Sequence, residues 1–298
     1  MGTPRIGIIG GTGLGQTLAD EVGGRQVQVE TPFGLPSGPI LVTHWAGADV
    51  AFLSRHGPGH LLNPSAVPYR ANIWALKSLG VTHIVASGAT GSLNERIAPR
   101  DLVLCDQVID KTHKRAATFF DEGLVAHVEF AEPFCPKLRG LLTEAADSIK
   151  AKVHSAGTYV CMEGPQFSTV AESNMHRAWG GDLIGMTAMP EAKLAREAEI
   201  SYALVALVTD YDCWRPHAPG KDRALLMHEI LEHLKAATDN GVALLRAVLP
   251  PLADRLDEPW PYADALGMAI WSDKNAVDPA VVQRLDLLAG RYFRPEVS

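Results

Sequence analysis

Short apolar runs that favour β-strands alternate with helical patterns along most of this 298-residue chain. The apolar runs predict strands at residues 5–9, 40–43, 50–54, 82–87, 102–109, 158–162, 183–186 and 201–208. Helical periodicity predicts helices at residues 69–79, 137–152, 170–179, 191–199, 221–248 and 279–288. Helices that separate apolar strands indicate an α/β fold whose largely parallel sheet is covered on both faces. With 47% hydrophobic residues, the chain can also build a sizeable core.

Charge and cysteine content narrow the classes of function. The net charge is −7, so the chain lacks the basic surface of a nucleic-acid-binding protein, although one local site can still bind a small anion. The four cysteines form no CxxC pair, which predicts reduced thiols in a cytoplasmic protein. The N-terminus lacks the apolar core of a signal peptide, and no apolar stretch reaches 18 residues, so no membrane partner is expected.

Three motifs that follow predicted strands are suited to an anion. A glycine turn at residues 10–13 can direct backbone N–H groups at a phosphate, and Thr12 adds a hydroxyl, although a plain tight turn has the same composition. Arg55 offers a fork of donors and His56 one more, unless the two form only a surface ion pair and a loop histidine. Small residues at Gly88 and Ala89 allow close approach of a ligand or simply a tight connection.

Three later motifs are suited to a nucleoside. Phe167 follows a Gly-Pro turn and can wall a flat ring, Met186 can lie along a sugar, and Thr187 can bond an anion, although buried Phe and Met are more often core residues. Asp210 and Asp212 end an apolar strand, where carboxylates need partners or a task; helix capping is the alternative. The sequence has no metal-ligand spacing and no GxSxG nucleophile motif.

Taken in order, the motifs GGTG, RHG, GSL, EGPQFS, MT and TDYDCW resemble the trimeric purine nucleoside phosphorylases, over residues 5 to 248. The resemblance implies a single α/β domain of the nucleoside phosphorylase type at 1–248, with a mixed central sheet flanked by helices. Residues 249–298, which begin at a Leu-Pro-Pro break, are expected to be a C-terminal extension packed on that domain. The resemblance also implies a homotrimer, inorganic phosphate as co-substrate, and neither a metal nor an organic cofactor.

The resemblance assigns the site residue by residue. The implied phosphate contacts are Thr12, Arg55, His56, Gly88, Ala89 and Thr187. Met186 would pack on the ribose. Phe167, Ser168, Asp210 and Asp212 would surround the base. His127 would reach the 5′ group of a neighbouring subunit's substrate.

Two positions depart from the family pattern. Members usually carry Thr where this chain has Gly88, so Gly88 offers only its backbone; either Ser87 or Ser92 compensates, or phosphate binds less tightly. A short insertion at residues 217–223 lies near the family's substrate-gating loop, and its role is open.

The expected reaction is phosphorolysis of 5′-methylthioadenosine. Asp210, held protonated or protonated through water, would deliver a proton to N7 of the purine, while His56 would act at the phosphate. Asp210 and Ser168 together favour a 6-aminopurine over a 6-oxopurine. Adenosine, a 6-oxopurine nucleoside or methylthioinosine are alternative substrates. A hydrolytic nucleosidase and a non-catalytic purine-binding protein are alternative functions.

Overall fold

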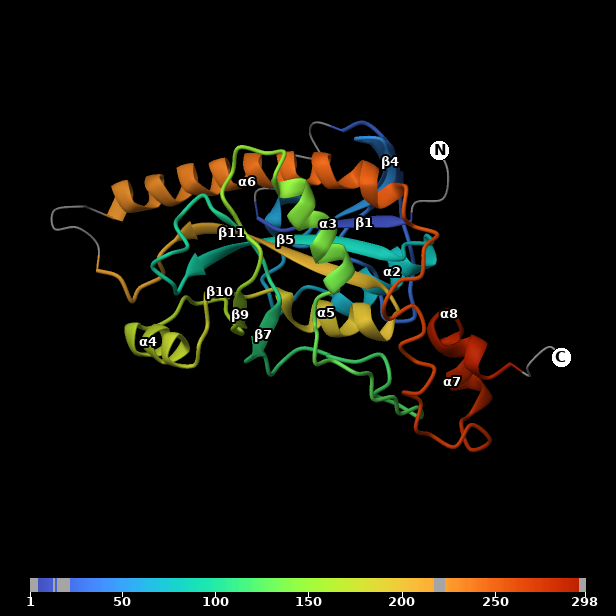
Figure 1. The fold of residues 1–298 in the computed structure, drawn as a ribbon. Coiled ribbons are helices and arrows are strands. Elements are labelled where there is room, and N and C mark those ends of the chain that lie inside the picture. Colours follow the sequence, from blue (N-terminus) through green and yellow to red (C-terminus); the bar gives the residue numbers. More distant parts are fainter. Residues whose placement is uncertain (1–4, 13, 15–21, 217–222, 295–298) are drawn as a thin grey trace.

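The computed structural model describes residues 5–12, 14, 22–216 and 223–294 (Figure 1). Within these residues, eleven strands form one sheet, and five of them align along its centre in the order β3-β4-β1-β5-β10. The strands are β1 (Ile6–Gly10), β2 (Arg25–Val27), β3 (Ile40–Trp45), β4 (Ala48–Ser54), β5 (His83–Ser92), β6 (Leu102–Leu104), β7 (Gln107–Asp110), β8 (Val153–His154), β9 (Thr158–Cys161), β10 (Leu183–Gly185) and β11 (Ser201–Asp210).

The pairing of the central strand β5 determines which strand ends lie close together. β5 pairs in parallel with β1 and β11 and antiparallel with β10, so the sheet is mixed, as the family resemblance implies. The register sets Ile9 beside both Leu53 of β4 and Ala86 of β5. The carboxyl ends of the parallel strands β1 and β4 therefore lie beside the second half of β5. The segments that follow β1 and β4 meet β5 at this place.

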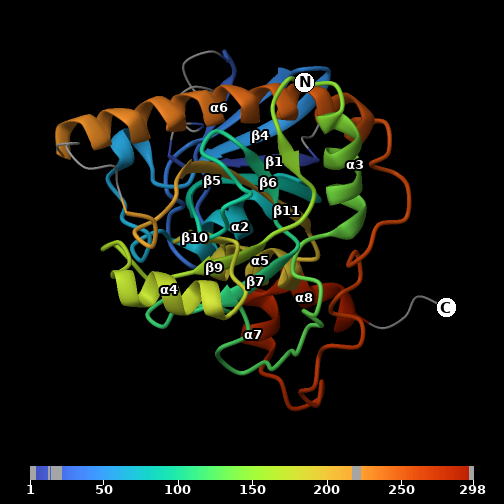
Figure 2. The same ribbon diagram turned by 60° about the vertical axis from the view of Figure 1, so that its left-hand side comes forward.

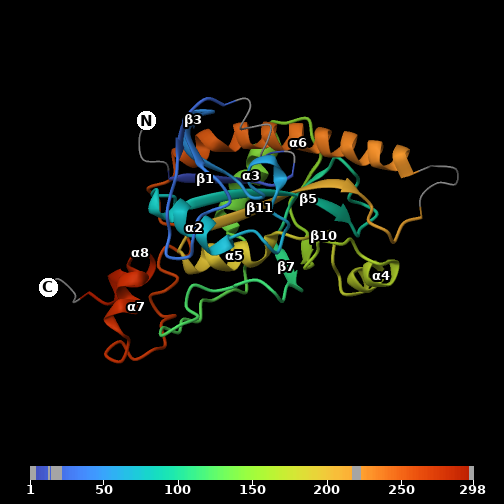
Figure 3. The same ribbon diagram turned by 180° about the vertical axis from the view of Figure 1, so that it is seen from behind.

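Helices cover both faces of the sheet, as the alternation predicted. They are α2 (Tyr69–Ser78), α3 (Pro136–Ala146), α4 (Val170–Ala178), α5 (Ala188–Glu197), α6 (Arg223–Ala253), α7 (Pro279–Arg284) and α8 (Asp286–Ala289), with short 3₁₀ turns at Pro58–His60 and Gly290–Tyr292. The long α6 crosses one face and α2 and α5 cover the other, which Figure 3 shows from behind. Within the described chain, none of these helices combines the length and apolarity needed to cross a membrane.

Several elements differ from their sequence-based bounds, and the single helix expected at 279–288 is two short helices, α7 and α8. β5 continues through Gly88 to Ser92, where a turn was expected, because neighbouring strands pair with this glycine-rich stretch on both sides. The single strand expected at 102–109 is two, β6 and β7, which pair with different partners. Helix α3 ends at Ala146, short of the expected 152. Helix α6 continues through Pro250 and Pro251 to Ala253, because fully buried leucines flank the prolines.

The chain after α6 packs back onto the α5 side of the sheet. Leu266, Leu285 and Leu288 belong to the same hydrophobic cluster as the residues of α2 and α5. Glu199, just after α5, accepts hydrogen bonds from the backbone of Leu266 (3.1 Å) and the hydroxyl of Tyr292 (2.5 Å). Figure 2 shows α7 and α8 beneath α5.

Candidate active site

The turn after β1, the end of β4 and the middle of β5 lie in close contact. The backbone N–H of Arg55 donates to the carbonyl of Gly10 at 2.9 Å, which joins the first two segments. A Cβ atom at Gly11 would lie 2.8 Å from both Nη1 of Arg55 and the carbonyl oxygen of Ser87. Only glycine fits at position 11, because a Cβ atom there would collide with both groups. The backbone of Gly11 therefore packs directly against the Arg55 guanidinium.

Arg55 lies beneath this turn as part of a buried ion pair. Its Nε and Nη2 donate to the two carboxylate oxygens of Glu191, each at 2.7 Å, and its Nη1 donates to the carbonyl of Ser87 at 2.7 Å. Burial disfavours the cation, but the Glu191 carboxylate outweighs this effect and holds the pKa of Arg55 above its usual range. The sequence suggested an open fork for phosphate; in the structure the fork binds Glu191, whose role the sequence did not reveal.

His56 is held in its neutral form. Its Nδ1 lies 2.8 Å from the carbonyl oxygen of Leu62, which can only accept, so Nδ1 carries a proton. Its ring stacks on His60 with 4.3 Å between centroids. Burial, with the nearby charge of Arg55, lowers the pKa of His56 to about 4. At neutral pH its Nε2 is therefore a hydrogen-bond acceptor.

Gly88 and Thr187 face each other across the site. A Cβ atom at Gly88 would lie 3.3 Å from Oγ1 of Thr187, its one near neighbour among the described residues. Thr187 precedes the first residue of α5, and within the described chain its side chain makes no capping hydrogen bond. The Thr187 hydroxyl therefore faces the backbone of Gly88.

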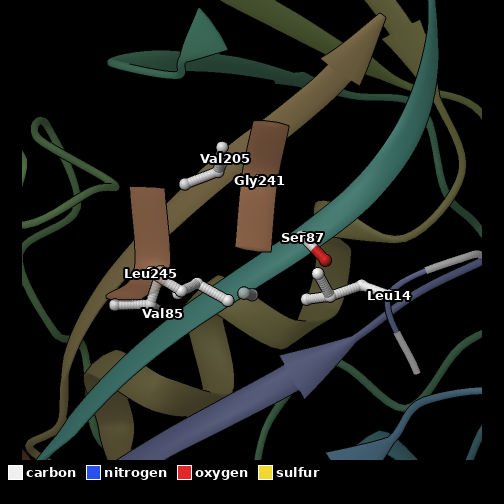
Figure 4. Close-up of a pocket in the computed structure, with 7 residues that line it drawn as sticks. Leu14, Val85, Ser87, Val205, Gly241 and Leu245 are labelled. Atoms are coloured by element: carbon white, nitrogen blue, oxygen red, sulfur yellow. The ribbon is translucent and has the colours of Figure 1, made fainter. Parts of the chain in front are cut away.

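Neither serine considered as a substitute for the missing threonine occupies this space. Ser87 points to the opposite face of β5, toward Leu14 and a 10 Å³ apolar cavity beneath α6, and its hydroxyl has no partner among the described residues (Figure 4). Ser92 lies on the correct face, but its hydroxyl is bonded to the backbone of Asn94. Ser87 faces away from this space because it is adjacent to Gly88, and neighbouring side chains along a strand point to opposite faces.

Thr12 and Ala89 complete the expected anion contacts. Thr12 is half-buried in the turn after β1. Ala89 lies within β5, opposite Leu207 of β11. Gly13 and the insertion at 217–222 are outside the described residues.

Asp210 and Asp212 lie together at the end of β11. Asp210 Oδ1 accepts from the backbone N–H of Asp212 at 2.7 Å, and its Oδ2 accepts from the Thr209 hydroxyl at 2.6 Å. The Thr209 hydroxyl also lies 3.2 Å from the carbonyl oxygen of Thr90. A hydroxyl on α4, that of Ser173, donates to Asp212 and joins this strand end to α4.

The loop before α4 brings Ser168 to the same strand end. The thiol of Cys213 contacts the carbonyl of Ser168 at 3.3 Å, and the Ser168 hydroxyl lies 3.8 Å from Sδ of Met162. Phe167 lies 83% exposed, with its ring free to cover a ligand. Met186 packs against the same loop: a Cβ atom at Gly164 would lie 2.6 Å from its sulfur.

His127 lies apart from this group, against the C-terminal segment. Its backbone N–H donates to the carbonyl of Ala269 at 2.8 Å, and its ring meets Trp271 edge-on at 5.4 Å. Ala126 forms an antiparallel bridge with Ile270. The structure therefore brings together the expected phosphate, ribose and base residues. His127 lies apart from them, beside Ala269 and Trp271 of the C-terminal segment.

Comparisons with known proteins identify the family to which the fold is related. Residues 5–250 match the phosphorylase superfamily. The chain is 46% identical to the S-methyl-5′-thioadenosine phosphorylase of Gloeobacter violaceus, over 98% of each protein, and 47% identical to that of Cereibacter sphaeroides, over 97% of this chain and 98% of that protein. Among solved structures, it resembles a methylthioadenosine phosphorylase from an antarctic soil metagenomic library (TM-score 0.86, 44% identity, 97% of this chain and 99% of that one). It also resembles the Schistosoma mansoni methylthioadenosine phosphorylase in complex with tubercidin (TM-score 0.79, 35% identity, 90% and 100%).

Proposed function

The chain belongs to the phosphorylase superfamily, and we propose that it catalyses phosphorolysis of 5′-methylthioadenosine to adenine and 5-methylthioribose 1-phosphate. In this reaction the C1′–N9 bond breaks and its electron pair stays with the purine. An oxygen of phosphate forms the new bond to C1′, and a proton reaches the purine at N7. The enzyme is therefore a pentosyltransferase.

The convergence of Gly11, Arg55, Gly88 and Thr187 on one small space carries this proposal. Glycine backbones and a hydroxyl suit an oxyanion, and hydrolysis by water has no use for such a site. Bound phosphate beneath C1′ both stabilises the developing positive charge on the sugar and attacks it. Phosphate supplies the nucleophile, so the proposed reaction needs no metal or organic cofactor.

His56 favours phosphate that retains one proton. Because its Nδ1–H is bonded to Leu62, its Nε2 can accept the hydroxyl hydrogen of monohydrogen phosphate. We propose that this contact orients the dianion so that an unprotonated oxygen faces C1′.

Asp210 is proposed to deliver the proton to N7 of the base, either as a protonated acid or through a bound water. Its place beside Thr209 and Asp212 at the end of β11 supports this role. The N6 amino group of adenine can donate to Asp210, whereas the oxygen of a 6-oxopurine cannot. Ser168 and Asp212 lie at the same strand end, and Phe167 is proposed to cover the ring.

We further propose a cytoplasmic homotrimer in which His127 reaches a neighbour's 5′-methylthio group. All four cysteines are free thiols, which is typical of a reducing compartment. The His127 ring and Trp271 together give the partly apolar surface that a methylthio group requires.

Product analysis with three nucleosides tests the proposal. The purified chain is incubated with 5′-methylthioadenosine, adenosine or inosine, each with and without phosphate. We expect phosphate-dependent release of adenine, fastest from 5′-methylthioadenosine. Equal release without phosphate would indicate a hydrolase, faster cleavage of inosine would contradict the 6-amino assignment, and binding without base release would indicate a non-catalytic protein.

A further inference from the structure

Arg115 lies at the junction of the loops that carry the ribose and base residues. Its side chain is 1% exposed, although it belongs to a loop between β7 and α3. Its Nη1 donates to the carbonyls of Met186 (2.5 Å) and Met189 (2.6 Å), and its Nη2 donates to the carbonyl of Glu163 (2.6 Å). Three backbone carbonyls from two separate loops thus converge on one guanidinium.

These carbonyls lie beside the proposed ligand contacts. Met186 and Met189 bracket Thr187, so Arg115 fixes the stretch that presents the Thr187 hydroxyl at the start of α5. Glu163 directly precedes the turn that leads to Phe167 and Ser168. Arg115 therefore sets the distance between the segment that carries Met186 and Thr187 and the loop at residues 164–168.

The two loops touch each other where Arg115 joins them. A Cβ atom at Gly164 would lie 2.6 Å from Sδ of Met186, and Gly164 has a φ of +71°, so only glycine is suited to this contact. A small change in loop separation would displace Met186 or open a gap beside it. The planar guanidinium presents its donors in a fixed fork spread over three nitrogens, whereas lysine offers rotatable donors on one nitrogen.

The Glu163 carboxylate neutralises the charge of Arg115. It also anchors the loop that contains Glu163, through hydrogen bonds to other segments. Its carboxylate accepts from the backbone N–H of His113 (2.7 Å), from the Ser65 hydroxyl, and from Nε of Arg115 at 3.4 Å. These bonds overcome the effect of burial and lower the pKa of Glu163 to about 2. The Glu163 carboxylate is therefore charged at every pH at which the enzyme would be assayed.

We propose that Arg115 is a positioning residue, which holds Met186, Thr187 and the 164–168 loop at the separation that a nucleoside and phosphate require. The inference rests on the proposed phosphorolysis. It assigns Arg115 no contact with substrate: the residue acts through the loops it joins. Misplacement of reacting groups by about 1 Å can cost on the order of 100-fold in rate.

Substitution of Arg115 by lysine tests this role against a matched variant. Arg196 is also buried and donates to two backbone carbonyls, those of Glu129 and Glu132. We expect R115K to lower kcat/KM for 5′-methylthioadenosine about 100-fold, with effects on both kcat and KM. R196K should change kcat/KM by less than about threefold, while lowering the thermal midpoint as much as R115K does.

A rescue experiment separates positioning from loss of folding. In R115A, millimolar guanidinium should restore a measurable part of kcat, whereas equal concentrations of methylammonium or sodium chloride should not, because only guanidinium reproduces the planar donors. Equal activity losses in R115K and R196K, or rescue by every salt, would overturn the inference. If the wild-type chain releases no adenine under any condition, the proposed phosphorolysis itself fails.

Discussion

The residues of the site are connected by a few close contacts whose chemistry is specific. Arg55 is neutralised by Glu191 and supports the turn at Gly11, while His56 is fixed as a neutral acceptor by Leu62. Asp210 contacts Thr209 and Asp212 at the end of β11. Single substitutions at Asp210 and Gly88 should change substrate choice or phosphate binding more than folding.

Asp210→Asn tests the base preference. Asn retains an acceptor for the Asp212 N–H but adds a donor, which suits the oxygen of a 6-oxopurine better than an amino group. We expect kcat for 5′-methylthioadenosine to fall roughly 100-fold or more, with the ratio of kcat/KM values shifted toward inosine. Assays of both nucleosides measure the shift, and D239N, at an exposed position on α6, serves as control. Unchanged rate and preference would remove Asp210 from the base site.

Gly88→Thr tests the missing phosphate donor. A side chain at position 88 meets only the Thr187 hydroxyl, at 3.3 Å from Cβ, so the described surroundings can accept it. One added hydrogen bond of about 0.5–1.5 kcal/mol predicts a KM for phosphate lowered roughly 2- to 10-fold. G88A separates the effect of the hydroxyl from that of the added carbon. A higher KM in G88T would show that the space at Gly88 is itself needed by phosphate.

At the scale of elements, α5 organises the molecule. It begins at the phosphate side with Thr187, binds Arg55 through Glu191, and binds the backbone of Phe119 and the hydroxyl of Thr118 through Glu197. One helix therefore joins the candidate site to the long segment between β7 and α3.

Glu197 predicts a pH dependence of stability. Burial raises the pKa of Glu197 to about 7, against 4.5 in the unfolded chain. Between these values the folded state binds more protons, so this residue's contribution to stability is present below pH 4.5 and is lost as pH rises toward 7. The shift corresponds to ~3 kcal/mol.

Glu197→Gln should remove that contribution. We expect the thermal midpoint of E197Q to fall less than that of the wild type between pH 5 and pH 8. His56 and His83 act in the opposite direction, because burial lowers the pKa of each to about 4, and they remain in both proteins. E144Q, at an exposed position on α3, should follow the wild type. Parallel wild-type and E197Q curves would contradict the raised pKa.

At the scale of the whole molecule, the C-terminal segment packs into the hydrophobic core and also contacts the region around His127. Leu266 and Leu288 pack in the core cluster that includes α5, while Trp271 donates its backbone N–H to the carbonyl of Val125 at 3.0 Å. The assignment of residues 1–248 to one catalytic domain and 249–298 to an extension on it remains a prediction. Removal of the extension would expose part of that core.

Mixed trimers test whether His127 serves a neighbour. H127A subunits keep Asp210 but offer no His127, whereas D210N subunits are impaired at Asp210 but still offer His127. Coexpressed together, they should give higher kcat/KM than the average of the two separate variants, because some sites are completed across an interface. Light scattering should give three times the 32.0 kDa chain mass. Activity equal to the average would place His127 within its own subunit.

Much of the fold and the chemical types at the site follow from the sequence. Alternating strand and helix patterns predicted that helices cover both faces of the sheet, and the motifs at strand ends predicted Thr187 and Asp210 as site residues, which the structure places at or near strand ends. Periodicity is local, so it was sufficient for these elements. It was insufficient for β5 beyond Ser87, where pairing with two neighbouring strands overrides a composition typical of a turn.

The tertiary structure alone decided which residues support those groups. Glu191 lies 136 residues from Arg55, and Arg115 lies 71 residues from Met186, so no local pattern relates either pair. The structure also showed that Ser87 faces away from Gly88's side of the sheet and that Asp210 is bonded to the backbone N–H of Asp212. Residue type and spacing determine which chemistry a chain can offer, whereas the charge state and position of each group depend on partners that only folding brings into contact.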